Sequence, residues 1–296
     1  MKHRHSFLAL LVLFQALIVG FTNIAAKQAA MEIDPFVVSF FRYLIGTVTL
    51  AAILLAKGGS LHVEKTDLKP LFLLMFTGVL CNQILFAQAL RYTIPSHPPM
   101  IYALTPVVII FIDILRKKEP ASGKILLASL LAFVGVGVVL GRSVLIFNAP
   151  ILLGDGLVFI AMLFWSVYTI FSKPYVHRYG PLQLALILII GALVLYTPWG
   201  VIRLAQADVQ ALTWKGWLSI VYLGIFSSGF SYLNYFAILK RIRPSQTGLI
   251  ISTHPPVTLI LSVLLGFEVL QWNMIAGSLL IILALWIAQR RDKLRP

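Results

Sequence analysis

Charged residues are scarce in this chain of 296 residues: Asp, Glu, Lys and Arg together make up only 11% of it. A typical soluble domain carries about 25% charged residues. Hydrophobic residues make up 59% of the chain, and the mean hydropathy is +0.93. We therefore expect an apolar outer surface with a lipid bilayer as its solvent. The net charge of +14 then indicates basic cytoplasmic loops, and no nucleic-acid partner is expected.

The apolar runs also lack the alternation of a membrane β-strand. The run from Ile125 to Leu140, for example, is almost unbroken, whereas barrel strands alternate apolar and polar residues. Backbone groups in lipid must bond within the protein, which leaves helices or closed barrels. The sequence therefore predicts an all-α integral membrane protein.

Enzyme motifs are missing as well. The chain has no His-Glu-x-x-His metal helix, no Gly-x-Ser-x-Gly elbow and no Gly-x-x-x-x-Gly-Lys-Ser/Thr phosphate loop. The six histidines are scattered, and the one cysteine, Cys81, excludes an intramolecular disulfide. We predict that the protein is not an enzyme and uses no metal or cofactor. The alternative is an integral-membrane enzyme, or a receptor or assembly protein that transports nothing.

What the chain does have is a series of apolar stretches long enough to cross a bilayer. A span needs about 20 mostly apolar residues, and we predict ten such helices joined by short connections. They are Phe7–Ala26, Phe36–Ala56, Leu71–Leu90, Pro98–Leu115, Ile125–Gly141, Leu153–Ser172, Leu182–Ile202, Gly216–Leu239, Gln246–Leu265 and Met274–Ala288.

Basic residues are distributed unevenly over the connections between these spans. If both termini are cytoplasmic, 18 of the 24 Lys and Arg residues lie on the cytoplasmic side and 5 on the outer side, while Arg42 lies within a span. Cytoplasmic loops are enriched in Lys and Arg. The bias predicts a multi-pass protein of the plasma (inner) membrane with both termini in the cytoplasm.

The two halves of the chain resemble each other. Prolines and an acidic residue recur without gaps at a spacing of 149 residues: Pro95 with Pro244, Pro106 with Pro255, and Glu119 with Glu268. We predict two five-helix repeats, residues 1–142 and 151–290. Because five is odd, the second repeat enters the membrane inverted. Inverted repeats are typical of secondary transporters, with the binding site near the midplane between them.

Several stretches resemble one known family. The second repeat begins with DGLVFIAMLFWSVY, and the fourth and ninth spans contain YALTPVVIIFIDILRKKEP and IISTHPPVTLILSVLLGFE. An arginine follows Pro35 in DPFVVSFFR. Over nearly the whole chain, these stretches and their order resemble the drug/metabolite transporter superfamily, in its ten-span branch of two EamA domains. The first span lacks the tryptophan that the family often has there, with Ala16 or Val19 nearby instead.

This resemblance implies a secondary transporter that works by alternating access. Members move small organic solutes such as amino acids, their analogues or other metabolites, often outward. The resemblance also implies a central cavity lined mainly by spans 1, 3, 4, 6, 8 and 9. It fixes neither the substrate nor the coupling ion, and it leaves a homodimer open.

Polar and aromatic residues within the spans are the candidates for substrate binding, because such groups need a partner or a water-filled cavity in lipid. Each of them can instead bond or pack between helices. The candidates are Asn82, Gln83, Tyr102, Trp165, Tyr168, Tyr232, Tyr235 and His254. A midplane His254 could bind an anion or relay a proton, or it could simply bond to a carbonyl.

Prolines in the fourth and ninth spans are predicted to shape the cavity. Pro106, Pro255 and Pro256 lie near the middle of their spans. Proline removes a backbone donor and frees a carbonyl one turn back. We expect a kink or hinge at each site, with plain helix irregularity as the alternative.

Two further residues carry open questions. Arg42 lies within the second span and needs an acceptor, for which Asp34, Asp155 or a freed carbonyl are the candidates. We interpret it as a structural charge, with contact to the substrate as the alternative. His97 lies near the outer end of the fourth span, where it either contributes to a gate or simply faces the surface.

Overall fold

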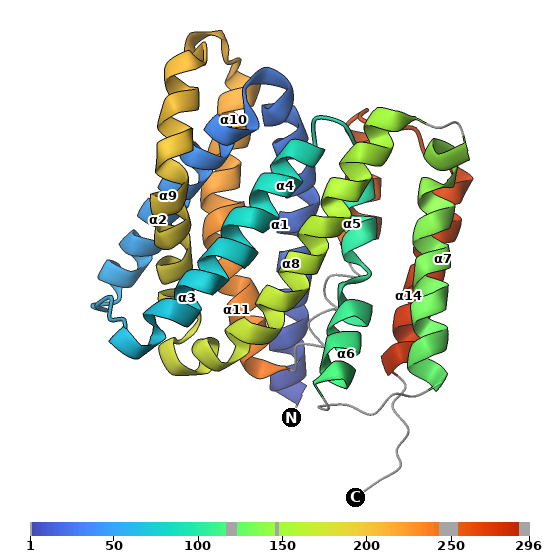
Figure 1. The fold of residues 1–296 in the computed structure, drawn as a ribbon, viewed down its shortest axis with the longest axis horizontal. Helices are drawn as coiled ribbons and strands as arrows, with labels where there is room; N and C mark the ends of the chain where they lie inside the picture. The colour runs from blue at the N-terminus through green and yellow to red at the C-terminus, as the bar shows by residue number, and fades with distance from the viewer. Residues whose placement is uncertain (1, 117–122, 146–147, 243–253, 290–296) are drawn as a thin grey trace, which may run out of the picture.

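A computed structural model describes residues 2–116, 123–145, 148–242 and 254–289 of the chain. Within these ranges the chain forms helices and turns, and no strand is found there. The helices stand side by side in one bundle (Figure 1). The start of α1 (Lys2–Glu32) and the last turn of α14 (Trp272–Gln289) lie at the same end, which we call the terminal end. The opposite end, where α1 finishes at Glu32, is called the far end.

The second predicted span begins where its sequence specifies a helix start. It corresponds to α2 (Pro35–Ala56), and Asp34 precedes it as the capping residue. The Asp34 carboxylate accepts a hydrogen bond of 2.8 Å from the backbone N–H of Phe36. A capping oxygen together with proline in the first turn satisfies helix donors that would otherwise be free.

The third and eighth predicted spans are each continuous helices with a wide π-helical segment in the middle. The third consists of η1 (Lys65–Asp67), α3 (Leu68–Leu74), the π-helical η2 (Met75–Cys81) and α4 (Asn82–Ala89). The eighth consists of α10 (Trp214–Tyr222), the π-helical η4 (Leu223–Ser231) and α11 (Tyr232–Arg241). The 149-residue shift places η2 on η4 almost residue for residue. Such segments often occur at functional sites.

The fourth predicted span is broken. It consists of α5 (His97–Tyr102) and α6 (Thr105–Leu115), and the break falls directly before Pro106. Proline cannot donate a backbone hydrogen bond and clashes with the preceding turn, so the interruption at this place follows from the sequence. Its counterpart is α13 (His254–Leu264), of which the first predicted turns, and the side chain of Pro256, lie outside the described residues.

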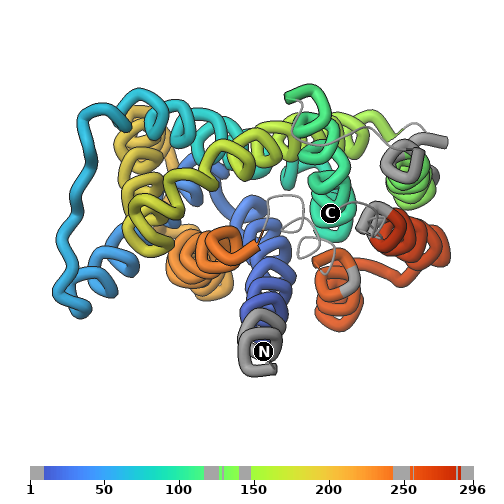
Figure 2. Tube along the Cα trace, turned by 90° about the horizontal axis from the view of Figure 1, so that it is seen from below, coloured from blue at the N-terminus to red at the C-terminus, as the bar shows by residue number. Residues whose placement is uncertain are grey.

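The remaining helices complete the bundle. They are α7 (Gly123–Leu145), α8 (Ala149–Tyr179), α9 (Pro181–Gln206) and the short η3 (Val209–Ala211). Viewed from the terminal end, α7 and α14 form a pair at one side of the molecule, with α2 and α9 at the other (Figure 2). A Cβ atom on Gly277 of α14 would come within 2.5 Å of the Gly135 carbonyl of α7. The absence of side chains at these positions therefore lets the two backbones approach.

Seven stretches of described helix are long and apolar enough to cross a membrane. They are Leu10–Glu32, Pro35–Ala56, Lys65–Ala89, His97–Leu115, Ala149–Tyr179, Pro181–Gln206 and Trp214–Arg241. The other three predicted spans correspond to α7, α13 and α14, which have shorter described apolar stretches. Large apolar side chains, such as Leu10, Val194 and Trp199, are exposed on the outside of the bundle. The prediction of an all-α membrane protein is confirmed, while the count of ten spans stays a prediction.

Contacts between the two halves occur in matching pairs. Helix α1, the first span, packs on α13, the ninth; α8, the sixth, packs on α5 and α6, the fourth. In the same way, the second span α2 packs on η4 of the eighth, and the seventh span α9 packs on η2 of the third. If each span is replaced by its counterpart five spans away, the first contact of each pair turns into the second. A two-fold relation between the predicted repeats would produce this pattern.

Candidate functional site

A cavity of about 110 Å³ lies between α1, α2, α4, α5, α8, η4, α11 and α13. These helices include all the spans that the family resemblance implied, and α2 in addition. Seven of the eight predicted binding residues line the cavity. They are Asn82, Gln83, Tyr102, Trp165, Tyr232, Tyr235 and His254.

The predicted repeat relates several of these residues to one another. The shift of 149 residues pairs Asn82 with Ser231, Gln83 with Tyr232, and Phe86 with Tyr235, and all six line the cavity. Each trio begins at or just after the end of a π-helical segment. In both halves the π-helical segment therefore ends at, or one residue before, the start of the trio.

Two side-chain amides organise the polar wall. Gln83 Nε2 donates to Asn82 Oδ1 at 2.9 Å and to the Tyr232 hydroxyl at 3.3 Å. Asn82 Nδ2 in turn donates to the Tyr102 hydroxyl and to the Ala161 carbonyl, both at 2.6 Å. Asn82 is fully buried. Each side chain in this series of hydrogen bonds has a partner, so the wall is held in one arrangement. The hydrogen bonds join α4, α5, α8 and α11.

Arg42 extends this network from α2. Its Nε donates to Ser228 Oγ at 3.0 Å, Nη2 donates to Ser227 Oγ at 3.0 Å, and Nη1 donates to Gln83 Oε1 at 3.1 Å. The residue is buried, with 4% of its surface exposed, and it lines the cavity. The prediction that Asp34, Asp155 or a freed carbonyl accepts from Arg42 was wrong.

Those expected carboxylates are engaged elsewhere. Asp34 pairs with Arg91, and Asp155 contacts His97. Sequence position alone could not reveal this, because two of the three acceptors that Arg42 does use, Ser227 and Ser228, lie in the other half of the chain.

Polar residues of α1 form another part of the lining. Gln15 Nε2 donates to Ser231 Oγ at 2.8 Å, and Asn234 Nδ2 donates to Gln15 Oε1 at 2.8 Å. Asn23 Nδ2 lies 3.3 Å from Thr258 Oγ1 of α13. Gln15 and Asn23 line the cavity and also join helices, so their roles as lining and as helix contacts coincide.

Aromatic rings form the apolar part of the site. The Trp165 ring lies 5.0 Å from the Tyr235 ring and 6.0 Å from the Tyr232 ring, measured between centroids. Tyr168 is the predicted binding residue that lies outside the lining. Its ring is fully buried 5.2 Å from Trp165, and a Cβ atom on Gly78 would come within 1.9 Å of it. Helical spacing placed Tyr168 beside Trp165 but could not tell which of the two rings reaches the cavity.

His254 lines the cavity from the first turn of α13. The residue is buried, and its Nε2 atom finds no hydrogen-bond partner among the described residues. A buried nitrogen without a partner is unusual, since such groups are almost always satisfied. Its position at the cavity makes a bound solute a suitable partner.

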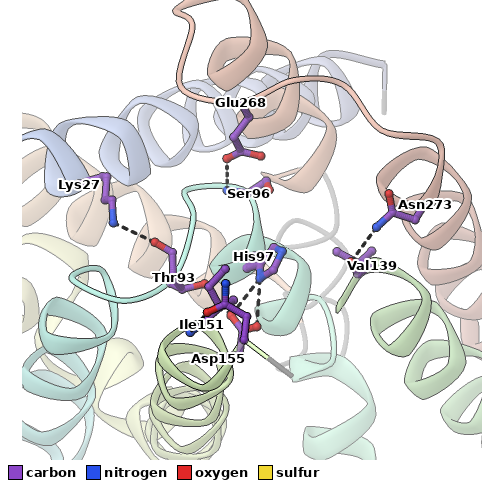
Figure 3. Close-up of polar contacts among 10 residues, drawn as sticks. Lys27, Thr93, Ser96, His97, Val139, Ile151, Asp155, Glu268 and Asn273 are labelled. Atoms are coloured by element: carbon purple, nitrogen blue, oxygen red, sulfur yellow. Dashed lines mark hydrogen bonds and ion pairs between the residues drawn. The ribbon is translucent and has the colours of Figure 1, made fainter. Parts of the chain in front are cut away.

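A second group of polar residues lies toward the far end, and we call it the far-end cluster: Lys27, Thr93, Ser96, His97, Asp155 and Glu268 (Figure 3). His97 Nδ1 lies 3.0 Å from both Asp155 oxygens, and Thr93 Oγ1 donates to Asp155 Oδ1 at 2.6 Å. The side chains of His97 and Asp155 are almost completely buried. Of the two interpretations left open for His97, surface placement is therefore wrong.

The far-end cluster ties the connection between α4 and α5 to three neighbours. Lys27 of α1 donates to the Thr93 carbonyl at 2.9 Å, and the backbone N–H of Ser96 donates to Glu268 Oε1 at 2.8 Å. Asp155 supplies the contact from α8. Glu268 thus lies against the other half of the chain, while Glu119, which the 149-residue repeat pairs with it, lies outside the described residues.

Some lining residues carry no signal that sequence reasoning could have used. Val19, Phe86, Pro98 and Pro99 line the cavity, yet they resemble ordinary apolar residues of a span. Val19 stands near the place where the family often has a tryptophan. Ser227 and Ser231 do carry a signal, because they are polar and lie four residues apart, which places them on one helix face.

Comparison with known proteins places this architecture in a family. The sequence profile of the EamA-like transporter family matches residues 6–141 and again residues 152–289. A protein of Archaeoglobus fulgidus, named an uncharacterized transporter, is 26% identical over 287 residues, covering 96% of this chain and 98% of its own. The inner membrane transporter YhbE of Escherichia coli, also named uncharacterized, is 25% identical over 281 residues, covering 90% of this chain and 83% of its own.

A solved structure shows the same fold. One crystal structure aligns with a TM-score of 0.74 over 97% of this chain and 99% of its own, at 20% sequence identity. At that identity the likeness concerns the fold alone. The two matches of the family profile together cover most of the chain, and the chain therefore belongs to the EamA-like transporter family.

Proposed function

We propose that this protein is a secondary transporter that exports small organic metabolites, such as amino acids or related compounds, by alternating access. The observation that carries the proposal is the cavity enclosed by both halves of the chain. A site between two repeats can be exposed to either side of the membrane when the repeats move against each other. The lining offers hydrogen-bonding groups and aromatic faces, which suit a small organic solute.

The far-end cluster supports the alternating part of the proposal. Its buried contacts hold the far end of α1, α4, α5 and α8 together and link them to the segment after α13. An outward-open state would have to separate some of these contacts. The cluster is therefore the feature that would keep one entrance closed while the other is used.

Reconstitution into liposomes tests the proposal. Liposomes that contain the purified protein would be loaded with an unlabelled metabolite, and counterflow of the labelled metabolite would be measured for a panel of amino acids and organic acids. We expect at least one solute to accumulate transiently in protein-containing liposomes and not in protein-free ones. A thermal melt would show that the protein is folded. If folded protein gave no counterflow with any solute of the panel, the proposal would be contradicted.

We further propose that both termini lie in the cytoplasm and that the membrane is the inner membrane. Basic residues occur where helices begin or end near the terminal end (Figure 1): Lys57 follows α2, η1 begins at Lys65, and Arg178 lies in the last turn of α8. In addition, YhbE is named an inner membrane transporter. Reporter fusions at Lys2 and His62 should read cytoplasmic, and a fusion at Ala207 should read external. The opposite result would reverse the orientation.

A further inference from the structure

Arg42 is a buried cation for which the described part of the protein supplies no negative partner. Its hydrogen-bond acceptors are two serine hydroxyls and one amide oxygen, all neutral. The guanidinium also lies 5.8 Å from the Tyr43 ring centroid, which gives a modest attraction. A buried charge is costly unless it is paired, so the cavity holds a positive charge that no carboxylate of the described chain offsets.

The acidic residues elsewhere in the described chain already have partners. Glu32 accepts from Thr213, Asp34 pairs with Arg91, Glu64 and Asp67 pair with Arg178, Asp113 lies 3.7 Å from Arg116, Asp155 contacts His97, Asp208 accepts from Gln210, and Glu268 accepts from Ser96. No ion pair links any of these carboxylates to Arg42. A counter-charge for this residue must therefore come from outside the described chain.

The geometry of the guanidinium leaves room for such a charge. An arginine side chain has five N–H donors arranged as a planar fork, and three of them are used by Ser227, Ser228 and Gln83. The other two find no acceptor among the described residues. Because Arg42 lines the cavity, a solute inside can reach these donors. A carboxylate fits an arginine fork better than any neutral group does.

The rest of the cavity indicates what the anionic group is attached to. The Tyr232 and Tyr235 rings lie 6.0 Å and 5.0 Å from the Trp165 ring, measured between centroids, and the three rings offer flat apolar faces. His254 adds an unpartnered Nε2 atom. An inorganic anion would use Arg42 and leave the aromatic faces without a partner, whereas an organic anion would use both.

We propose that the cavity selects organic anions, with a carboxylate bound to Arg42 and an apolar body against Trp165 and its neighbouring tyrosines. This inference rests on the proposed transport function for its physiological meaning, but the binding site itself does not depend on it. Of the two roles that the sequence left open for Arg42, the proposal takes substrate contact rather than structural pairing alone. Ser227, Ser228 and Gln83 are then positioning residues that hold the guanidinium in place.

Paired probes test the proposal by direct binding. The probes are benzoate, phenylacetate and 4-methylpentanoate, each compared with its own neutral amide, together with chloride and phosphate. Binding to the purified protein in nanodiscs would be measured by calorimetry at neutral pH. We expect carboxylates to bind about tenfold to a hundredfold more tightly than their amides, as expected for a charge-assisted contact. Equal binding of both members of every pair, or binding of the inorganic anions alone, would overturn the proposal.

Variants then show which residue causes the preference for carboxylates over amides. Arg42→Gln should remove the difference between carboxylate and amide, while the matched control Arg91→Gln should retain it, since Arg91 is partly exposed and pairs with Asp34. A preference that survives Arg42→Gln would overturn the assignment. If Arg42→Gln does not fold, Arg42→Lys keeps the charge but loses the fork. This variant should prefer carboxylates with lower affinity, and an unchanged affinity would overturn the assignment.

Failure of this inference can be told apart from failure of the proposed function. Carboxylates that bind through Arg42 but show no counterflow would leave the anion site intact and remove the transport function. Counterflow of the neutral amides alone would support transport and remove the anion proposal.

Discussion

The cavity and the far-end cluster differ in the partners that their buried charged groups have. In the far-end cluster, Asp155 lies between His97 and Thr93, and Glu268 accepts a backbone hydrogen bond. In the cavity, Arg42 has only neutral neighbours, and His254 has a nitrogen without a partner. In the far-end cluster the acceptor Asp155 is shared by two side chains, although Ser96 Oγ and Glu268 Oε2 find no partner among the described residues. In the cavity, by contrast, the charge of Arg42 has no acidic partner among those residues, and under our proposal a bound solute supplies it.

Removing the Asp155 carboxylate from the far-end cluster should have the largest effect on stability. Asp155→Ala leaves the buried Thr93 hydroxyl and the His97 ring without their acceptor. We expect the free energy of unfolding to fall by about 3 kcal/mol, because unsatisfied buried groups carry their full desolvation cost. Thermal melts in detergent would measure the change. The control Glu64→Ala breaks an exposed pair with Arg178 and should cost less than about 1 kcal/mol; equal losses would abolish the contrast.

Removing the central ring of the cavity should affect transport more than stability. Trp165→Ala takes away the face that Tyr232 and Tyr235 surround, so uptake by liposomes should fall about tenfold or more, as for loss of a well-packed binding contact. Membrane insertion should remain intact. Trp199→Ala, an exposed tryptophan on α9, is the matched control and should transport normally. Normal flux in the Trp165 variant would assign this ring to helix packing alone.

The pH dependence of uptake examines whether His254 behaves as a binding group. Only histidine changes charge readily between about pH 5 and pH 8, and glutamine keeps hydrogen bonding without that change. His254 is buried, and burial disfavours the charged imidazole, so the ring would titrate in this range only beside a bound anion. In that case we expect His254→Gln to flatten the profile of initial uptake rates over this range. Superimposable profiles for the two proteins would make His254 a structural residue and would weaken the distinction between the two regions.

The smallest effect is expected at Tyr168, which lies beside the cavity but does not line it. Its hydroxyl is buried and has no hydrogen-bond partner among the described residues. Tyr168→Phe should therefore leave uptake unchanged and stability equal or slightly raised, because it removes a polar atom that gains nothing from burial. Tyr232→Phe is the comparison, since its hydroxyl accepts from Gln83, and its uptake should fall. A transport defect in the Tyr168 variant would extend the binding site beyond the cavity observed here.

Local patterns in the sequence were sufficient to predict the helices, since apolar runs of membrane length and prolines at α2 and α6 act on their own neighbourhood. They also selected most of the lining, because Asn82, Gln83 and Trp165 are costly in lipid unless they face a partner or a cavity. The predicted internal repeat also contributed to the prediction of the lining, because it relates Gln83 to Tyr232 across 149 residues.

Long-range pairing could not be predicted in the same way. That Arg42 uses Ser227 and Ser228, and that His97 meets Asp155, depends on which helix faces are brought together by packing. Apolar lining residues such as Phe86 and Pro99 were missed because apolar side chains in a span look alike whether they face lipid, protein or cavity. The π-helical geometry of η2 and η4 also has no clear mark in the sequence, although it decides which face Ser231 presents.

The π-helical segments η2 and η4 give the two halves a built-in rotational register. Each segment lets the chain accommodate an extra residue without ending the helix, and each lies directly before cavity residues. If either segment returned to regular α-helix, the residues beyond it would turn by one position, about 100° around the helix axis. Gln83 in one half, or Tyr232 in the other, would then leave the cavity, so binding groups could be withdrawn from the solute by a twist of one helix rather than by separation of whole repeats.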